Sequence, residues 1–203
     1  MKSSQWMYVA LFAALAISVQ LAAQDNPNHQ STFTTFDAPG AGTGSYQGTY
    51  PFAINPEGAI TGLYVDASNM YHGFLRDRDG TLTAFDPSGS IFTSPSGINL
   101  EGTITGSYCD VSFDCHGFVR DRHGTITTFD VPGVGTGYLL GTYPASINVE
   151  GAVSGCYTDA NSVGHGFLRD RDGTFTTFDF WFAGQDDNQF RGSWWELKPR
   201  RKV

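Results

Sequence analysis

The segment HGFLRDRDG, residues 72–80, decides the fold because the chain contains three versions of it. It returns as HGFVRDRHG at 116–124 and as HGFLRDRDG at 165–173. A second motif keeps the same step: TFTTFD, TLTAFD, TITTFD and TFTTFD begin at residues 32, 81, 125 and 174. These starts are 49, 44 and 49 residues apart, and internal periods of this length are typical of repeat architectures.

Each repeat predicts four short strands joined by turns. The alternation in TLTAF and its β-branched and aromatic composition favour a half-buried strand. The segments INPEG, INLEG and INVEG supply turn residues before a second strand such as AITGLYVD, and HGFLR follows as a third. The Asp79-Gly80 pair favours the mirror-image turn of a two-residue hairpin. Apolar residues keep no helical period outside the N-terminal segment, so we expect no helix there.

These strands predict an all-β fold of tandem four-stranded antiparallel blade-like repeats, which is a partial or open β-propeller. A β-trefoil and a β-prism use three units of similar length and remain alternatives. TFTTFD-like strands occur four times and the other motifs three times, so residues 32–179 hold three β repeats plus the first strand of a fourth. A closed threefold fold needs equal copies of every strand. We therefore expect an open, incomplete array of blades rather than a closed ring.

Residues 1–24 have the layout of a signal peptide. Lys2 is followed by an apolar run of about a dozen residues and then by small residues at Ala22 and Ala23. The run is shorter than the roughly 20 residues of a membrane-spanning helix, although an uncleaved anchor remains an alternative. We expect cleavage near Ala23 or Gln24, which makes the chain secreted, periplasmic or bound at the cell surface, with no membrane contact afterwards. Residues 25–31 form a polar leader.

The C-terminal tail, residues 180–203, resembles no repeat. It holds three of the four tryptophans and five of the twelve basic residues of the chain. Two interpretations remain open. The tail is either a degenerate or frameshifted end that replaced further blades, or a segment that caps the last sheet.

The charge of the chain excludes one broad class of partner. Twelve basic and 20 acidic residues give a formal net charge of −8. Nucleic-acid binding needs clustered Lys and Arg that neutralise phosphates, so no nucleic-acid partner is expected. An anionic membrane surface is disfavoured for the same reason.

The order INxEGxxxGxY, HGF, RDRDG and TxTTFDxPGxGTG resembles the HAF-type bacterial extracellular repeat, which is named for a His-Ala-Phe triplet. The resemblance covers roughly residues 32–179. It departs from the triplet where Gly stands in place of Ala, at Gly73, Gly117 and Gly166. The resemblance implies export and a repeated, propeller-like fold, and it implies no established activity.

Two polar positions recur in every repeat. One histidine opens each HGF motif: His72, His116 and His165. An aspartate follows the preceding strand: Asp66, Asp110 and Asp159. A ligand face or a metal-binding ring of imidazoles is one interpretation, but groups shared by all units usually belong to the scaffold, and a structural hydrogen bond is the interpretation we adopt. We predict no catalytic, cofactor-binding or metal-ligating residue.

The cysteines are less regular. Cys109 and Cys115 flank the DVSFD connection of the middle repeat, and in an exported chain this spacing predicts a disulfide across a hairpin. The other two repeats have no cysteine at either position. Cys156 occupies the position of Leu63 and Ser107 and is expected to be an unpaired strand residue. Its thiol is a candidate for an intermolecular bond.

Three function classes follow. The first is an exported non-catalytic module of a propeller-like array, with a glycan or protein ligand or a cell-surface structural role, which self-associates through open sheet edges. The second is a carbohydrate-active enzyme, a glycosidase or lyase, on a propeller scaffold. No asymmetric acid pair, GxSxG elbow or zinc motif supports it. The third is a truncated fragment with no function of its own.

Overall fold

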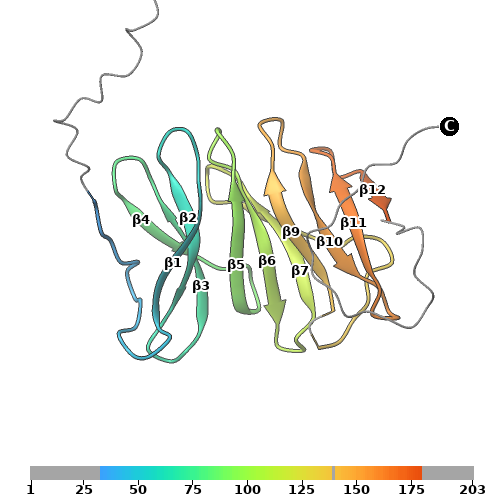
Figure 1. The fold of residues 1–203 in the computed structure, drawn as a ribbon, viewed down its shortest axis with the longest axis horizontal. Helices are drawn as coiled ribbons and strands as arrows, with labels where there is room; N and C mark the ends of the chain where they lie inside the picture. The colour runs from blue at the N-terminus through green and yellow to red at the C-terminus, as the bar shows by residue number, and fades with distance from the viewer. Residues whose placement is uncertain (1–32, 139, 180–203) are drawn as a thin grey trace, which may run out of the picture. The chain divides into compact units, whose positions relative to one another are not determined.

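The computed structural model describes residues 33–138 and 140–179. These residues form twelve β-strands and no helix (Figure 1). It follows that no described helix has the length and apolar character needed to cross a membrane. The predicted signal peptide (1–24), polar leader (25–31) and C-terminal tail (180–203) lie outside the described residues.

The strands follow the sequence repeats, four to each. The first blade consists of β1 (Gly48–Ile54), β2 (Ile60–Val65), β3 (Tyr71–Arg76) and β4 (Leu82–Phe85). The second consists of β5 (Ser90–Ile98), β6 (Ile104–Asp110), β7 (Cys115–Arg120) and β8 (Ile126–Phe129). The third consists of β9 (Thr142–Ile147), β10 (Val153–Thr158), β11 (Gly164–Arg169) and β12 (Phe175–Phe178). The TFTTFD-like segments thus form the outer strands β4, β8 and β12, whereas Phe33–Asp37 carries no regular secondary structure.

Within each blade the strands are antiparallel neighbours in chain order. A parallel bridge between Tyr71 and Phe92 joins the first blade to the second, and an equivalent bridge joins Cys115 to Gly141 in the third. No sheet is closed within the described ranges 33–138 and 140–179. The predicted fold class, all-β with tandem four-stranded antiparallel blades in an open array, is confirmed.

The turn after HGFLR differs from the predicted two-residue hairpin. A mirror-image turn needs a positive φ at both central residues, but of Asp79 and Gly80 only Gly80 has one, at 91°. The amide of Gly80 donates to the carbonyl of Asp77, which closes a longer turn followed by a left-handed glycine. The prediction was wrong because the Asp-Gly pair also serves this three-residue loop with a bulge.

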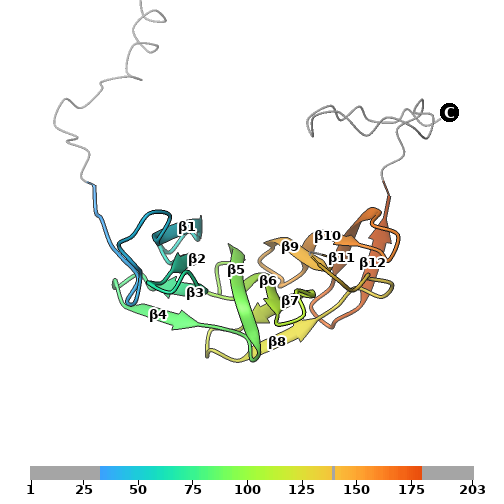
Figure 2. The same ribbon diagram turned by 90° about the horizontal axis from the view of Figure 1, so that it is seen from below.

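The core lies between the blades, which stack against one another (Figure 2). Leu75 of the first blade packs with Ile104 and Phe118 of the second. In the same way, Val119 of the second blade packs against the buried cluster of the third. The second blade therefore buries one face against the first blade and the other against the third.

Aromatic rings of the outer strands β4 and β8 pack on the next blade. The ring of Phe85 in β4 meets Phe118 edge-on at 6.0 Å between centroids, and the Arg120 guanidinium lies over Phe85 at 5.0 Å. The same contact recurs as Phe36, Phe74 and Arg76, and as Phe129, Phe167 and Arg169. The glycine of HGF makes room for the outer-strand ring: a Cβ at Gly117 would lie 2.6 Å from the ring of Phe129.

Turn asparagines connect neighbouring blades at their ends. The Asn55 side chain accepts hydrogen bonds from the amides of Glu57 and Ala59, which shapes its own turn. Its Nδ2 donates to the carbonyl of Asn99 at 3.0 Å. Asn99 repeats the arrangement and donates to the carbonyl of Asn148 at 3.1 Å. The NxEG motif therefore fixes both the turn and the spacing between blades.

Candidate functional site

A histidine held between two carboxylates recurs in all three blades. The Nδ1 atom bonds the aspartate after the outer strand: His72 to Asp86 at 2.7 Å, His116 to Asp130 at 2.9 Å and His165 to Asp179 at 2.5 Å. The Nε2 atom faces the hairpin aspartate: Asp66 at 3.6 Å, Asp110 at 3.9 Å and Asp159 at 3.5 Å. A tyrosine ring packs on each imidazole, with 4.9–5.1 Å between centroids.

Local structure places these groups. His72 is the cross-strand partner of Tyr64, so their rings lie on the same face of the sheet. Asp66 follows β2, and its Oδ1 accepts hydrogen bonds from the amides of Ser68 and Met70, which closes the hairpin. These backbone donors, that of Met70 foremost, lower the pKa of Asp66, and the hydrogen bond from His72 contributes further. One carboxylate thus shapes the loop and orients the imidazole.

The third blade repeats this electrostatic pattern. The amide of Val163 is the main cause of a lowered pKa for Asp159, followed by that of Asn161. The hydrogen bond with Asp179 raises the pKa of His165 above the ordinary 6.5, although partial burial opposes the shift. The third-blade cluster therefore favours a protonated His165 imidazole beside an ionised Asp159 carboxylate.

The structure brings the predicted residues together in pairs: His72 with Asp66, His116 with Asp110 and His165 with Asp159. Sequence reasoning missed their second partners, Asp86, Asp130 and Asp179, although each follows its histidine by 14 residues. That constant spacing was the available signal. Among the described residues, no group of three or more His, Cys, Asp or Glu side chains is arranged to hold a metal ion.

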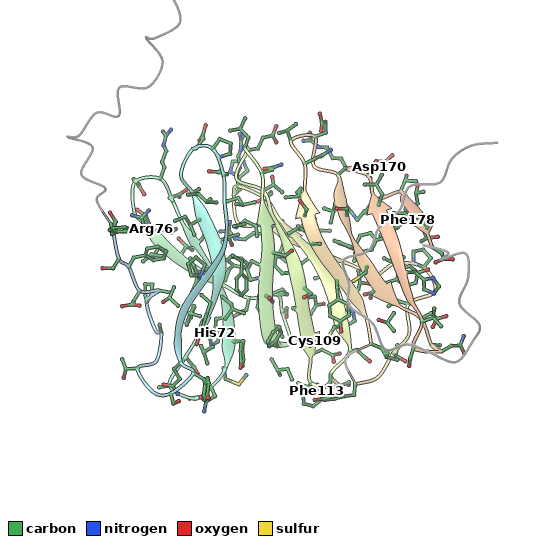
Figure 3. All side chains as sticks on the ribbon, in the orientation of Figure 1. His72, Arg76, Cys109, Phe113, Asp170 and Phe178 are labelled. Carbon is green, nitrogen blue, oxygen red and sulfur yellow. A yellow bond between two sulfur atoms is a disulfide. The ribbon has the colours of Figure 1, made fainter. Side chains whose placement is uncertain are left out.

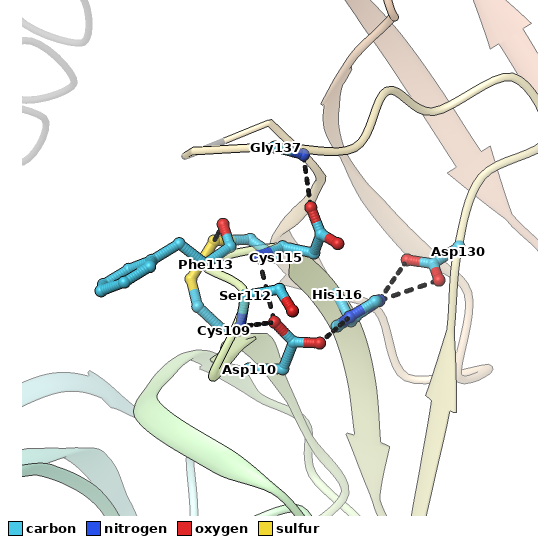
Figure 4. The surroundings of a disulfide bond; sticks show 9 residues. Cys109, Asp110, Ser112, Phe113, Cys115, His116, Asp130 and Gly137 are labelled. Atoms are coloured by element: carbon cyan, nitrogen blue, oxygen red, sulfur yellow. Dashed lines mark hydrogen bonds and ion pairs between the residues drawn. A yellow bond between two sulfur atoms is a disulfide. The ribbon is translucent and has the colours of Figure 1, made fainter.

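The hairpin of the second blade carries a disulfide. Cys109 ends the pairing of β6 with β7, directly opposite Cys115, and their sulfur atoms are bonded with the Cα atoms 4.1 Å apart (Figure 4). Asp110 closes the loop by accepting from the amides of Ser112 and Asp114. This hairpin is therefore held by a covalent bond in addition to the hydrogen bonds that its counterparts in the other blades make.

Phe113 stands at the tip of this hairpin with a φ of 63°, in the left-handed region. The same position holds Asn69 in the first blade and Ser162 in the third, also left-handed. Asn is common in this conformation, whereas a bulky side chain is unusual. Phe113 is 46 % exposed and points away from the His116 and Asp130 pair (Figure 4). It lies at the opposite end of the sheets from Arg76 and Asp170 (Figure 3).

A second exposed ring lies beside Phe113. Tyr138, in the loop before β9, is 74 % exposed, and its ring centroid is 5.6 Å from that of Phe113 with the planes tilted by 51°. The Asp114 carboxylate accepts a hydrogen bond from the Gly137 amide, and the Cys115 amide donates to the Leu140 carbonyl at 3.1 Å. The two rings therefore come from different blades but stand on segments that are bonded to each other.

Sequence reasoning missed Phe113 and Tyr138. The signal was an aromatic residue at a loop position that is Asn or Ser in the other repeats, and it gains meaning only once the backbone angle and the neighbouring ring are known.

A polar groove lies between the turns of the first and second blades. It has a volume of about 250 Å³ and is lined on one side by Glu57, Asp77 and Arg78 and on the other by Glu101 and Arg122. A smaller groove of about 180 Å³ recurs between the second and third blades. Both are formed by repeated turn residues and carry charges of both signs.

No protein-family model and no curated protein sequence matches the chain.

Proposed function

We propose that the chain is an exported, non-catalytic glycan-binding module of HAF-like propeller repeats, and that Phe113 and Tyr138 form its contact surface. The observation that carries this proposal is the pair of exposed rings, 5.6 Å apart, on a hairpin closed by a disulfide. Aromatic side chains offer large contact areas at a small loss of conformational freedom.

The size of the surface favours a sugar over a protein. The exposed parts of two rings cover far less than the roughly 800 Å² that each partner buries in a specific protein interface. One or two sugar units match this area, because a pyranose has a face of C–H groups that stacks on an aromatic ring. Polar edges of the sugar can bond to the loop beside the rings, as in other sites that combine aromatic contact with a few polar groups.

The charge around the rings favours a neutral sugar. Asp110 and Asp114 lie in the same hairpin, and the net charge of the chain is −8. An anionic glycan would be repelled. A monosaccharide of about 12 non-hydrogen atoms at about −0.3 kcal/mol per atom corresponds to a Kd of roughly 2 mM. Higher affinity then requires an oligosaccharide that reaches both rings.

The repeated clusters support a non-catalytic role. Each imidazole has a carboxylate on either side, and the same arrangement occurs in every blade, as expected for scaffold. Catalysis generally needs groups with different roles around one reacting atom. The disulfide suits an oxidising compartment, in agreement with the export that the HAF-like repeats and the N-terminal segment imply.

A neutral-glycan array followed by calorimetry on the best oligosaccharide tests the proposal. Phe113→Asn removes one ring and installs the residue of the first blade at this left-handed position, so the fold should be retained. We expect this variant and Tyr138→Ala to weaken binding at least tenfold. Tyr46→Ala, which removes an exposed ring from the loop before β1, should bind normally.

Undiminished binding by both Phe113→Asn and Tyr138→Ala would refute the assignment of the site. Cleavage of an array sugar would favour the alternative of a glycosidase or lyase on the same scaffold.

A further inference from the structure

The third blade exposes a face that the first two blades bury. In the first blade, the side chains that face the next blade are covered, with Thr61, Leu63 and Leu75 at 0 %, 6 % and 8 % exposure. In the second, Thr105 is fully buried and Ser107 and Val119 are partly buried. The equivalent side chains of the third blade are all exposed: Ser154, Cys156 and Leu168.

This face keeps the character of an interface. None of Ser154, Cys156 and Leu168 carries a charge, and Leu168 is 38 % exposed. Proteins often carry charged side chains on exposed strands, and these charges prevent association with another chain. None of the three positions carries such a charge. Asn148 is also exposed, although its counterparts Asn55 and Asn99 are buried and donate to the following blade.

The surface that fits such a face is already known from the two internal junctions. Leu75 packs against Ile104, Tyr108 and Phe118 in the first junction, and Val119 packs in the cluster of Val153, Tyr157 and Phe167 in the second. The first blade has the same set at the equivalent positions: Ile60, Tyr64 and Phe74. We infer that the exposed face of the third blade binds the first blade of a second copy of this chain, head to tail.

For this contact to form, a phenylalanine ring of one copy must take the place of a phenylalanine ring in the next copy. In the internal junctions, the outer-strand rings Phe85 and Phe129 pack on the next blade beneath an arginine. At the first blade the place is taken by Phe36, which lies against Phe74 beneath Arg76. Phe178 of the preceding copy would leave its present contact and replace Phe36. The two rings stand in segments of identical sequence, because residues 32–37 and 174–179 are both TFTTFD.

Two consequences follow from this geometry. Phe36 competes with association, so its removal should promote assembly. The contact joins two different surfaces of the chain, so it is heterologous and either closes into a ring or continues as an open array.

Sedimentation velocity over a concentration series of the full chain tests the inference. We expect reversible association. Leu168→Asp should raise the concentration needed by at least tenfold, and Phe36→Ala should lower it by at least threefold. Val149→Asp, the same type of change at an exposed turn residue of the third blade, should have no effect. Because Leu168 is exposed, the Asp variant should keep the circular dichroism of the wild type, and Ser154→Arg serves the same purpose if it does not.

The thiol of Cys156 identifies what covers the face. It should react with a maleimide in the monomer and be protected at least tenfold in the assembled chain. A chain that stays monomeric at every concentration, or association unchanged by both Leu168→Asp and Ser154→Arg, would overturn the inference. It also fails if Cys156 is protected in the monomer and becomes reactive when residues 180–203 are removed, because the tail of the same chain is then the occupant.

Discussion

Reduction of the disulfide between Cys109 and Cys115 should destabilise the protein by about 2 kcal/mol. The two residues are six positions apart, and a cross-link that closes a loop of this size removes about 2 kcal/mol of conformational entropy from the unfolded chain at 25 °C. For a domain of roughly 150 residues, each kcal/mol shifts Tm by about 2–4 °C, so the expected decrease is about 4–8 °C. The pairing of β6 with β7 should persist after reduction, because the first and third blades pair the equivalent strands without a disulfide.

The measurement is thermal unfolding with and without a phosphine reductant, with a thiol count on the same samples. The chain has three cysteines, so the denatured protein should react with one equivalent of a thiol reagent before reduction and with three after it. A Cys109→Ala/Cys115→Ala variant should melt at the same temperature with and without reductant. The reasoning fails if the thiol count rises from one to three while Tm stays constant, or if three thiols are free from the start.

Two further predictions test the packing and the electrostatics. A Cβ at Gly106 would lie 2.3 Å from a backbone carbonyl of β5, whereas a Cβ at Gly164 meets no atom within 4 Å. Gly106→Ala should therefore lower the free energy of unfolding by about 1–3 kcal/mol, and Gly164→Ala should leave it unchanged. Denaturant unfolding measures both. The pKa of His165 is raised, so the stabilisation from its imidazole is present below pH 6.5 and is lost as pH rises through the raised pKa. The pKa of Asp159 is lowered, so the stabilisation from its carboxylate is present above pH 3.8 and is lost as pH falls through the lowered pKa. Unfolding from pH 3 to 9 should show the highest Tm between these limits, and Asp179→Asn should weaken the decrease above pH 6.5; a flat profile would contradict this account.

The fold could be predicted because repetition supplies the missing long-range information. TLTAF, AITGLYVD and HGFLR each indicate a strand, and their return at a constant step implies that each set forms one unit. The apolar residues Leu75 and Phe118 fall on strands in any such interpretation. Their contact across two blades does not follow from the strand pattern, because it depends on how consecutive sheets stack.

The polar network could be predicted only in part. A histidine in every repeat indicated a structural hydrogen bond, but its partner Asp86 belongs to a different strand, and the pairing of β3 with β4 brings the two together. The glycine of HGF stands where the HAF-type repeat has alanine, and the sequence alone offers no reason for this difference. The structure gives the reason, since the ring of Phe85 lies where a Cβ at Gly73 would be, 2.8 Å away.

The disulfide and the left-handed phenylalanine occur in the same hairpin, and their energies are similar in size. A side chain other than glycine in the left-handed region costs roughly 1–2 kcal/mol, which is close to the stabilisation of about 2 kcal/mol expected from the Cys109 to Cys115 bond. The first and third blades lack the bond, and they place Asn69 and Ser162 at this position. In the middle blade, the stabilisation from the covalent closure is large enough to offset the cost of Phe113 in this conformation. It follows that reduction of the disulfide should weaken sugar binding in the wild type but should leave Phe113→Asn, which has already lost the ring, at its own low affinity.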